Sequence, residues 1–242
     1  LLEKEGINKS QNIHFEGSDY REGEILLEAG VKLTAPRIAI IAGQGISSAK
    51  VIKDPMIAIV STGDELIDPG KACRPWQIWR SNPYGIKAEL MSVGISSENL
   101  KLFHLEDDRE KIFAALKNLL ENFDVIILSG GVSMGKFDFV KPVMQSLGVK
   151  EKFWKVLQKP GKPLFFGSLP HRMIFGLPGN PISSFICYVE YIHTSIQALQ
   201  NKKKDSKYRA ILTENFTVEN KKHRYLFGQS WIDSKGKLLC AP

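Results

Sequence analysis

Residues 124–131 read Asp124-Val-Ile-Ile-Leu-Ser-Gly-Gly131, a continuous apolar run that ends in a serine and two glycines. An apolar run without alternation is typical of a strand in a sheet that is covered on both faces. A second run of this kind, Met56-Ile-Ala-Ile-Val60, leads into Ser61-Thr-Gly63. Both runs are strand-sized and far shorter than the roughly 20 residues that a membrane span needs. They predict two buried strands, each followed by a loop, and no membrane segment.

Helical segments alternate with these strands. Asp107, three residues before Glu110, predicts a capping box at the start of one of the helices. The other expected elements are a helix over 82–93, a strand over 100–105, a helix with the apolar stripe 112–120, strands on both sides of the turn 176–181, and a helix over 182–199. This alternation predicts an α/β fold with a doubly wound, mostly parallel sheet, whose ligands bind beyond the carboxyl ends of the strands.

Three regions differ in composition. Residues 1–54 hold turns and one short apolar helix that ends at Gly43, residues 55–200 form the α/β domain, and residues 201–242 combine a basic linker with a partial β domain. The formal net charge is +7, and residues 201–242 alone carry ten basic and four acidic side chains, a net +6. The basic excess therefore belongs to the tail, and nucleic-acid binding is not expected.

The chain has three cysteines, Cys73, Cys187 and Cys240, without a CxxC pair. This number and spacing argue against a disulfide framework and against a thiolate zinc site. The first residues also lack the charged-then-apolar pattern of a signal peptide. We therefore expect a protein of the reducing cytoplasm.

The loop Ser129-Gly-Gly-Val-Ser-Met-Gly-Lys-Phe-Asp138 has the residues of an anion-binding turn. Its three glycines let a ligand approach the backbone N–H groups, and the hydroxyls of Ser129 and Ser133 add donors. It matches neither the GxxxxGK loop nor the GxGxxG fingerprint. A tight strand-to-helix turn needs the same glycines, so the loop alone leaves both interpretations open.

Three lysines, Lys155, Lys159 and Lys162, lie among apolar residues and prolines. A stiff loop that carries several ammonium groups suits a phosphate or another oxyanion. Solvation of the three side chains at the surface is the simpler alternative.

Carboxylates lie beside the predicted strand ends, at Asp64-Glu65, Asp107-Asp108 and Asp138. Carboxylates that face phosphates imply a divalent cation between them, and Mg²⁺ is the expected one. A capping role for Asp107 is compatible with a cation at Asp108. No ligand spacing relates the histidines, for which structural or surface roles are expected: His14, His104, His171, His193 and His223.

Six short motifs follow one another: Ser61-Thr-Gly-Asp-Glu-Leu66, Ser81-Asn82, Glu106-Asp-Asp108, Ser129-Gly-Gly-Val-Ser-Met-Gly135 with Asp138-Phe139, Lys159-Pro-Gly-Lys-Pro163 and Gly176-Leu-Pro-Gly-Asn-Pro-Ile-Ser183. Each is unspecific alone. In this order they resemble the molybdopterin molybdenumtransferase family, which includes the bacterial MoeA proteins and the E domains of gephyrin and of plant molybdenum insertases. The resemblance covers residues 17–200 well and the tail loosely.

The resemblance implies a molybdopterin-binding α/β domain between other domains. Residues 1–54 would then be the C-terminal part of a preceding domain or a linker, and the tail part of a small β-barrel. Enzymes of the family take adenylylated molybdopterin and molybdate, release AMP with the help of Mg²⁺ and leave molybdenum cofactor. A cytoplasmic homodimer and an adenylyltransferase partner from the same pathway are also implied.

The resemblance also assigns residues. The metal and the hydrolysis of the phosphoanhydride would be served by Glu65, Asp108 and Asp138. The terminal phosphate would be cradled by Gly130, Gly131 and Ser133, and phosphate or molybdate would be held by Lys155, Lys159 and Lys162. The other substrate-binding residues would be Ser61, Thr62, Gly63, Arg80, Asn82, Ser129, Pro178, Asn180, Pro181 and Ser183, with the loop 178–183 along the pterin or molybdate pocket.

Arg80 departs from the family pattern, which commonly has Asp at this position. In one interpretation Arg80 points to solvent, and the role of the carboxylate is lost or moves to Asp107 or Asp108. In the other, its guanidinium contacts a substrate phosphate in a bidentate way. We favour the second, because Trp76 and Trp79 would hold the loop in place.

Two alternatives to the transferase are open. A molybdopterin adenylyltransferase or a competence-damage protein would share the fold and the Ser-Gly-Gly loop, but would form adenylylated molybdopterin rather than consume it. A non-catalytic dimeric scaffold, as in gephyrin, would bind a partner peptide and release no AMP. Family residues from the N-terminal region have no counterpart in this sequence, so the fragment alone may be inactive.

Overall fold

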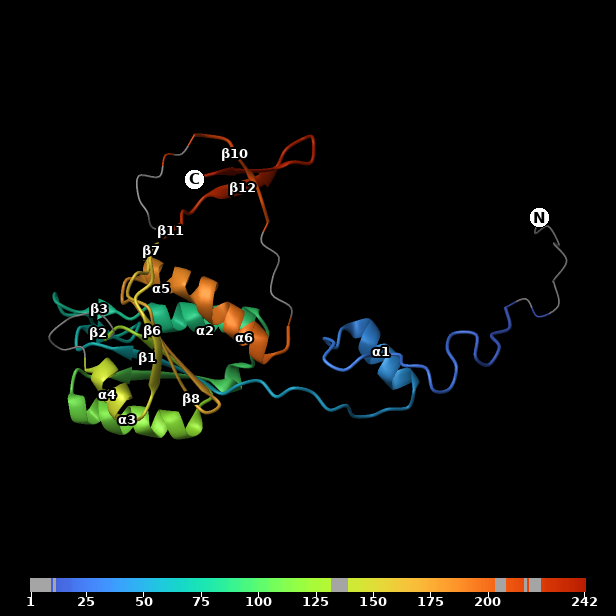
Figure 1. Cartoon of the computed structure of the whole chain (residues 1–242), viewed down its shortest axis with the longest axis horizontal. Coiled ribbons are helices and arrows are strands. Elements are labelled where there is room, and N and C mark those ends of the chain that lie inside the picture. Colours follow the sequence, from blue (N-terminus) through green and yellow to red (C-terminus); the bar gives the residue numbers. More distant parts are fainter. Residues whose placement is uncertain (1–9, 11, 132–138, 203–207, 216, 218–222) are drawn as a thin grey trace. The chain divides into compact units, whose positions relative to one another are not determined.

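The computed structural model describes residues 10, 12–131, 139–202, 208–215, 217 and 223–242. The chain divides into two compact units, Leu1–Val51 and Ile52–Pro242 (Figure 1). The first unit contains the predicted helix, α1 (Ala35–Gly43), with a proline in its first turn. Just after α1, the side chain of Gln44 donates a hydrogen bond of 2.5 Å to the hydroxyl of Tyr20. The predicted domain boundaries at residues 54 and 200 stay predictions.

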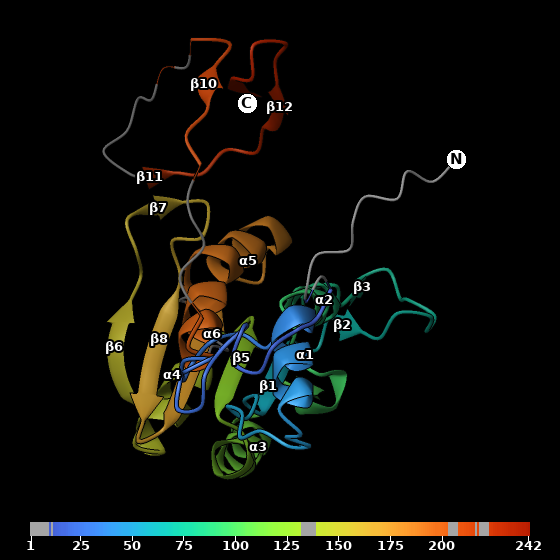
Figure 2. The ribbon, with the colours of Figure 1, turned by 90° about the vertical axis from the view of Figure 1, so that its right-hand side faces the viewer.

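The second unit is built on a six-stranded sheet with the order β4-β1-β5-β9-β8-β6 (Figure 2). Its strands are β1 (Ile57–Thr62), β4 (Leu100–Leu105), β5 (Val125–Ser129), β6 (Lys150–Trp154), β8 (Phe165–Leu169) and β9 (Arg172–Leu177). β1 pairs in parallel with both β4 and β5, and β5 pairs in parallel with β9. β8 runs antiparallel to β9 and β6. The predicted α/β fold with a mostly parallel sheet is confirmed.

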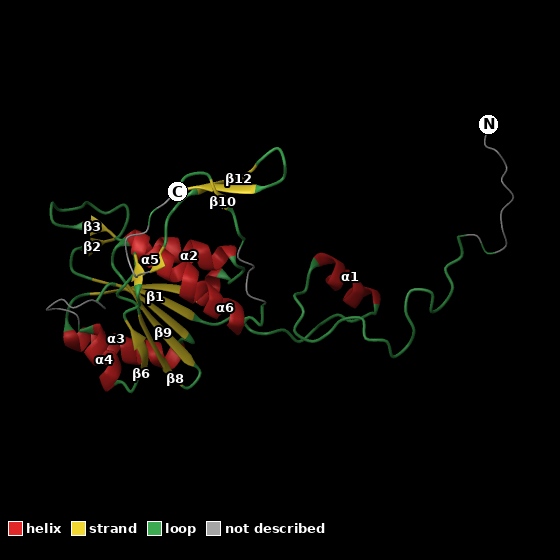
Figure 3. Cartoon of the chain, turned by 45° about the horizontal axis from the view of Figure 1, so that its top comes forward, coloured by secondary structure: helices red, strands yellow, loops and turns green. Residues whose placement is uncertain are grey.

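Helices cover both faces of this sheet (Figures 1 and 3). One face carries α3 (Arg109–Asn122) and α4 (Val140–Ser146), and the other carries α2 (Asn82–Ser92), α5 (Pro181–Cys187) and α6 (Thr194–Leu199), the last two joined by a π-helical turn over Tyr188–His193. Alternate strand residues supply the two cores, for example Ala58, Val60, Ile126 and Leu128 on the first face and Ile57, Ile59, Val125 and Ile127 on the second. None of the helices that the structure describes is long and apolar enough to cross a membrane.

The remaining elements are short. β2 (Leu66–Ile67) pairs in parallel with β3 (Ile78–Trp79), a 3₁₀ turn covers Ser97–Asn99, and β7 (Gln158–Lys159) pairs in parallel with β11 (His223–Arg224). In the tail, β10 (Ile211–Leu212), β13 (Leu238–Ala241) and β12 (Gln229–Ile232) form a three-stranded sheet. The tail is therefore a small β region, and its membership of a barrel stays a prediction.

The chain reverses direction across the sheet at β1. It passes from β1 to β4 on one side, and then crosses to β5 on the other side of β1. The loops that leave β1 and β5 therefore diverge, and such a switch point is where open α/β sheets bind ligands. It lies at the ends of the two apolar runs that predict the fold.

Two local predictions are wrong. The N-cap of α3 is Asp108, whose Oδ1 accepts from the N–H groups of Glu110 and Lys111 at 3.0 and 2.9 Å. Asp107 is not that cap, because the helix begins one residue later than the capping box requires. The turn 176–181 has a strand only before it, since Asn180 caps a helix that begins at Pro181.

The buried face of α3 offers a test of this packing. Leu116 is 1% exposed in the core that α3 shares with the sheet, and its neighbour Lys117 is exposed. Leu116→Ala should lower the free energy of unfolding by about 2–5 kcal/mol because it leaves a cavity, whereas Lys117→Ala should change it by less than about 0.5 kcal/mol. Urea denaturation measures both, and equal effects would contradict the packing.

Candidate functional site

Four loops leave the carboxyl ends of the four mutually parallel strands. They follow β1, β4, β5 and β9, and comprise residues 63–65, 106–108, 130–131 and 178–180 within the described part of the chain. Because parallel strands end at the same edge of a sheet, most of the residues predicted for the site lie along one edge. Ser133 and Asp138 lie outside the described residues.

The loops of β1 and β5 meet at the switch point. Gly130 and Gly131 both have left-handed backbone conformations, with φ of 98° and 66°. A Cβ atom at position 131 would lie only 2.8 Å from Thr62 Oγ1 and 2.7 Å from a methyl group of Val140. Thr62 is 5% exposed, and its hydroxyl has no hydrogen-bond partner among the described residues. The ends of β1 and β5 thus place a buried donor beside a glycine turn, a combination suited to a ligand oxygen.

Asn82 joins α2, β5 and the loop after β9. It lies in the first turn of α2, and its side-chain amide donates to Ser129 Oγ at 2.7 Å and to the carbonyl of Gly179 at 2.9 Å. Ser129 is buried at the end of β5, and Gly179 belongs to the loop after β9. Asn82 therefore fixes the spacing of two loops, a structural role beside its predicted contact with substrate.

The loop after β9 is held by its own side chains. Pro178 is buried, while Asn180 and Pro181 are exposed. Asn180 caps α5, with its Oδ1 accepting from the N–H of Ser183 at 3.2 Å and from its hydroxyl at 3.4 Å. The loop is thus ordered before any ligand binds, which favours a preformed pocket wall.

A cavity of about 530 Å³ opens at the ends of β1 and β4 and is lined by Asp64, Leu66, His104, Glu106, Asp107, Asp108 and Lys111. Asp64 accepts a hydrogen bond of 3.1 Å from the N–H of Asp107, which joins the two loops. Glu106 forms an ion pair with Lys111, and the hydrogen bond between them raises the pKa of Lys111 above its ordinary value. The cavity is therefore a polar site whose carboxylates are held by protein donors.

The structure separates the neighbours Asp64 and Glu65. Asp64 lines the cavity, whereas Glu65 does not. The carboxylate of Glu65 lies against Gly63, whose φ of 133° suits glycine and where a side chain would collide with it. Sequence reasoning named Asp64 and Glu65 together as candidate carboxylates, the resemblance assigned only Glu65, and His104 was expected to have a structural or surface role. Only the direction of the side chains after β1 and β4 could have distinguished them.

The carboxylates of the cavity could bind a cation only together with ligands from outside the protein. Within the described residues, no group of three or more His, Cys, Asp and Glu side chains could hold a metal ion. Mg²⁺, however, is commonly bound by one or two carboxylates together with phosphate oxygens and water. Asp64 and Asp108 line the same cavity and offer hard oxygen donors, so they fit a cation that is shared with a phosphorylated ligand.

Hydrogen bonds hold the loop that carries the three lysines in place. Its two arms are joined by backbone bonds from Val156 N to Lys162 O and from Lys155 N to Leu164 O, at 3.0 and 2.9 Å. Gln158 is 3% exposed and donates to the carbonyl of Pro160 at 3.1 Å. Its side-chain oxygen accepts from the hydroxyl of Tyr191 at 2.6 Å. A buried amide thus anchors the tip of the loop to the π-helical turn.

The three lysines of this loop differ in environment. Lys159 and Lys162 are exposed. Lys155 is half-buried, and its ammonium lies 4.0 Å from the centre of the Trp154 ring, which Lys141 also contacts at 3.6 Å. Contacts of this kind orient an ammonium group without neutralising it. The predicted binding of an oxyanion stays a prediction for all three.

Cys187 lies beneath the same loop and is inert. Burial raises the pKa of its thiol to about 12, although a weak hydrogen bond with Gln158 acts in the opposite direction. The thiol therefore stays protonated near neutral pH and is no nucleophile.

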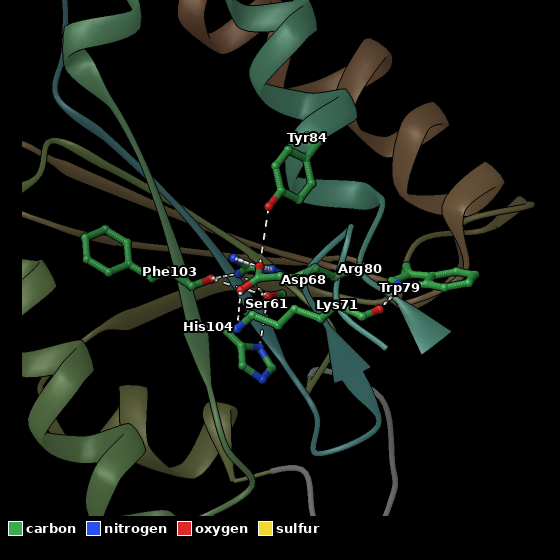
Figure 4. Close-up of polar contacts among 8 residues, drawn as sticks. All are labelled: Ser61, Asp68, Lys71, Trp79, Arg80, Tyr84, Phe103 and His104. Atoms are coloured by element: carbon green, nitrogen blue, oxygen red, sulfur yellow. Dashed lines mark hydrogen bonds and ion pairs between the residues drawn. The ribbon is translucent and has the colours of Figure 1, made fainter. Parts of the chain in front are cut away.

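Arg80 points inward (Figure 4). Only 11% of its side chain is exposed, so the interpretation that it points to solvent is wrong. Its Nε donates to Asp68 Oδ1 at 2.5 Å, and its Nη2 forms an ion pair with the same carboxylate. Its Nη1 donates to Ser61 Oγ and to the carbonyl of Phe103, both at 3.3 Å. A contact between Arg80 and a substrate phosphate stays a prediction.

The chain matches known proteins over most of its length. A family model described as a probable molybdopterin binding domain matches residues 58–198. The molybdopterin molybdenumtransferase of Synechocystis sp. is 40% identical over 204 residues, which are 83% of this chain and 52% of that protein. The enzyme of that name from Haemophilus influenzae is 33% identical over 239 residues, 95% of this chain and 57% of that protein. The chain thus spans about half the length of the curated relatives it matches.

A solved structure of similar fold agrees with these sequence relatives. The molybdopterin biosynthesis MoeA protein from Pyrococcus horikoshii has a TM-score of 0.72 and 26% identity, over 93% of this chain and 54% of that one. The reversal of strand order at β1 defines a doubly wound α/β domain. The chain belongs to the molybdopterin molybdenumtransferase family, with its molybdopterin-binding domain within residues 58–198. The resemblance read from the six motifs is confirmed.

Asp108 combines a structural and a predicted functional role, which two substitutions separate. Asp108→Ala removes the cap and should lower the free energy of unfolding by about 1 kcal/mol. Asp108→Asn keeps the acceptor oxygen and should cost less than half of that, mainly through the lost charge at the helix N-terminus. Both variants should lose Mg²⁺ affinity to a similar extent, as measured by titration calorimetry with a phosphorylated pterin. Unchanged affinity in Asp108→Asn would restrict Asp108 to capping.

Proposed function

We propose that this chain is the substrate-binding part of a molybdopterin molybdenumtransferase. It inserts molybdenum from molybdate into adenylylated molybdopterin and releases AMP in a step that depends on Mg²⁺. The observation that carries the proposal is the buried hydroxyl of Thr62 at the end of β1, which has no partner among the described residues and lies against the Gly130–Gly131 turn that follows β5. Its position beside a carboxylate-lined cavity suits a ligand with both a phosphate and a bound cation.

Different residues at this edge of the sheet contact different parts of the substrates. The backbone of Gly130 and Gly131 and the hydroxyls of Thr62 and Ser129 bind the terminal phosphate of the pterin. The exposed ammonium groups of the lysine loop attract the anionic substrates. The loop 178–183, including Pro178, Pro181 and Ser183, forms the wall on the far side of Asn82. Ser133 completes the proposed set of substrate contacts.

The carboxylates provide the site for Mg²⁺. Asp64 and Asp108 would hold the ion from the cavity, and Glu65 and Asp138 are the further carboxylates proposed for the metal. The cation would neutralise charge on the phosphoanhydride while AMP leaves. Asp138 orients the attacking water or accepts its proton.

The assembly is part of the same proposal. Residues 1–54 are part of a further family domain or a linker, and the active form is a cytoplasmic homodimer whose site includes the partner's N-terminal residues. The tail is part of a small β-barrel. An adenylyltransferase of the same pathway delivers the adenylylated pterin.

One assay tests the function. The chain is incubated with adenylylated molybdopterin, molybdate and Mg²⁺, and AMP is followed by chromatography. Release of AMP that requires all three components supports the transferase. Formation of adenylylated molybdopterin from ATP and molybdopterin would support the adenylyltransferase alternative, and binding of a partner peptide without AMP release would support the scaffold.

Asp138 is the first residue to change in that assay. Asp138→Asn keeps the shape and removes the charge, so it should lower AMP release by at least about 100-fold if the carboxylate serves as general base or metal ligand. Thermal stability should stay nearly unchanged. Glu121→Gln, an exposed acid on α3, is the matched control and should retain full activity. Full activity of a folded Asp138→Asn chain would refute the assignment.

The lysine loop gives a second test. Lys159→Ala with Lys162→Ala should weaken binding of a phosphorylated pterin, and the affinity of the parent should fall as salt is added, because exposed charges are screened. The matched control is Lys150→Ala with Lys152→Ala, two exposed lysines of β6, which removes the same charge elsewhere. Equal affinities of the two double variants at low salt would mean that Lys159 and Lys162 are merely solvated.

A further inference from the structure

A chain of polar contacts leads from Asp68 to the cavity (Figure 4). Asp68 pairs with Arg80, Arg80 donates to Ser61 Oγ, and Ser61 Oγ lies 3.2 Å from Nδ1 of His104. His104 in turn lines the cavity with Asp64 and the other carboxylates. The residue that departs from the family pattern is thus connected to a histidine to which the sequence assigned no role.

Arg80 is held in one orientation at the start of this chain. Its Nε and Nη2 both face Asp68, which fixes the plane of the guanidinium. Asp68 also contacts Lys71 at 3.3 Å and the hydroxyl of Tyr84 at 3.4 Å. Burial raises the pKa of Asp68, but the hydrogen bonds and charges of Arg80 and Lys71 outweigh it and leave the pKa below its ordinary value. The pair therefore stays ionised near neutral pH.

The hydroxyl of Ser61 determines whether Nδ1 of His104 accepts or donates a hydrogen bond. It is 1% exposed and has a single proton, with two acceptors in reach: the carbonyl of Phe103 at 3.3 Å and Nδ1 of His104 at 3.2 Å. Arg80 already donates to that carbonyl as well as to Ser61 Oγ. Because the carbonyl has a charged donor, the proton of Ser61 is available to Nδ1. A His104 ring that accepts at Nδ1 carries its proton on Nε2.

We infer that Arg80 is a positioning residue, which acts through Ser61 to hold His104 as the Nε2–H tautomer, and that this N–H donates to an anionic oxygen of the ligand in the cavity. The identity of that ligand rests on the proposed function, whereas the tautomer does not. The lysine that lines the cavity, Lys111, is already paired with Glu106. The Nε2–H of His104 is a neutral donor that adds to ligand binding without opposing a cation at the carboxylates.

The inference explains why position 80 needs arginine. A lysine offers one nitrogen and cannot reach Asp68, Ser61 and Phe103 together. An aspartate at this position would face Asp68 with a like charge. Asp68 and Arg80 therefore depend on each other.

Nitrogen NMR of the histidine rings tests the tautomer without any substrate. The chain is labelled with ¹⁵N-histidine and studied above the ordinary imidazole pKa of about 6.5, and His104→Gln identifies the signal among the five histidines. The parent should show His104 as the Nε2–H form. Arg80→Met and the gentler Arg80→Lys should move the equilibrium to Nδ1–H, because the proton of Ser61 then turns to Phe103. Lys71→Met, which removes a cation from Asp68 but does not touch Ser61, should leave the signal unchanged.

Two NMR results would overturn the inference: a parent in which His104 is Nδ1–H or evenly mixed, and a folded Arg80→Lys chain with the tautomer of the parent. The ligand contact has its own test in the AMP assay, where His104→Ala should lower kcat/KM by about 10- to 100-fold while Lys71→Met retains it. Equal kcat/KM for His104→Ala and the parent would exclude the contact. Absence of AMP release by the parent bears on the proposed function alone, and the NMR result still decides the role of Arg80.

Discussion

The reversal of strand order between β1 and β5 is the constraint on which the rest of the structure depends. Parallel strands direct their carboxyl ends to one edge, and the chain leaves β1 toward β4 but leaves β5 toward β9. The loops must diverge there, so a crevice remains that no crossover helix fills. Both strands are covered on their two faces, which makes the edge the place where polar side chains collect. Many unrelated families share such a topology, so the motifs on the loops, and not the strand order, distinguish the family.

Polar side chains then fix the loops that this topology brings together. Asn82 holds the loops after β5 and β9 at a set distance, Asp108 starts α3 beside the cavity, and Gln158 anchors the lysine loop to the π-helical turn. Each bond joins segments that are remote in the sequence or caps the element that follows a loop. A preordered edge of this kind lowers the entropy that a ligand must overcome on binding.

The departure at position 80 shows how such an edge tolerates a reversal of charge. Arg80 is stabilised by Asp68, and its remaining donors satisfy Ser61 and Phe103 at the ends of β1 and β4. The arginine at position 80 therefore adds hydrogen bonds at this edge, and its buried charge is paired with Asp68. An unpaired buried charge would destabilise the fold. In the proposed mechanism the same bonds place a neutral donor of His104 next to carboxylates that hold a cation.

The sequence by itself determined the four parallel strands β1, β4, β5 and β9, the helices α1, α2 and α3, and the family. Unbroken apolar runs such as Val125–Leu128 specify strands because burial on both faces leaves no room for polar alternation, and the six motifs identified the relatives. It also indicated which loops matter, since glycines and carboxylates follow those runs. Only the tertiary structure decided between Asp107 and Asp108 as a cap, between Asp64 and Glu65 at the cavity, and on the inward direction of Arg80. Neighbouring residues in a loop belong to the same motif, so the motif does not distinguish them. Asp64 is fixed by the N–H of Asp107, 43 positions away, and Arg80 by Asp68, 12 positions away.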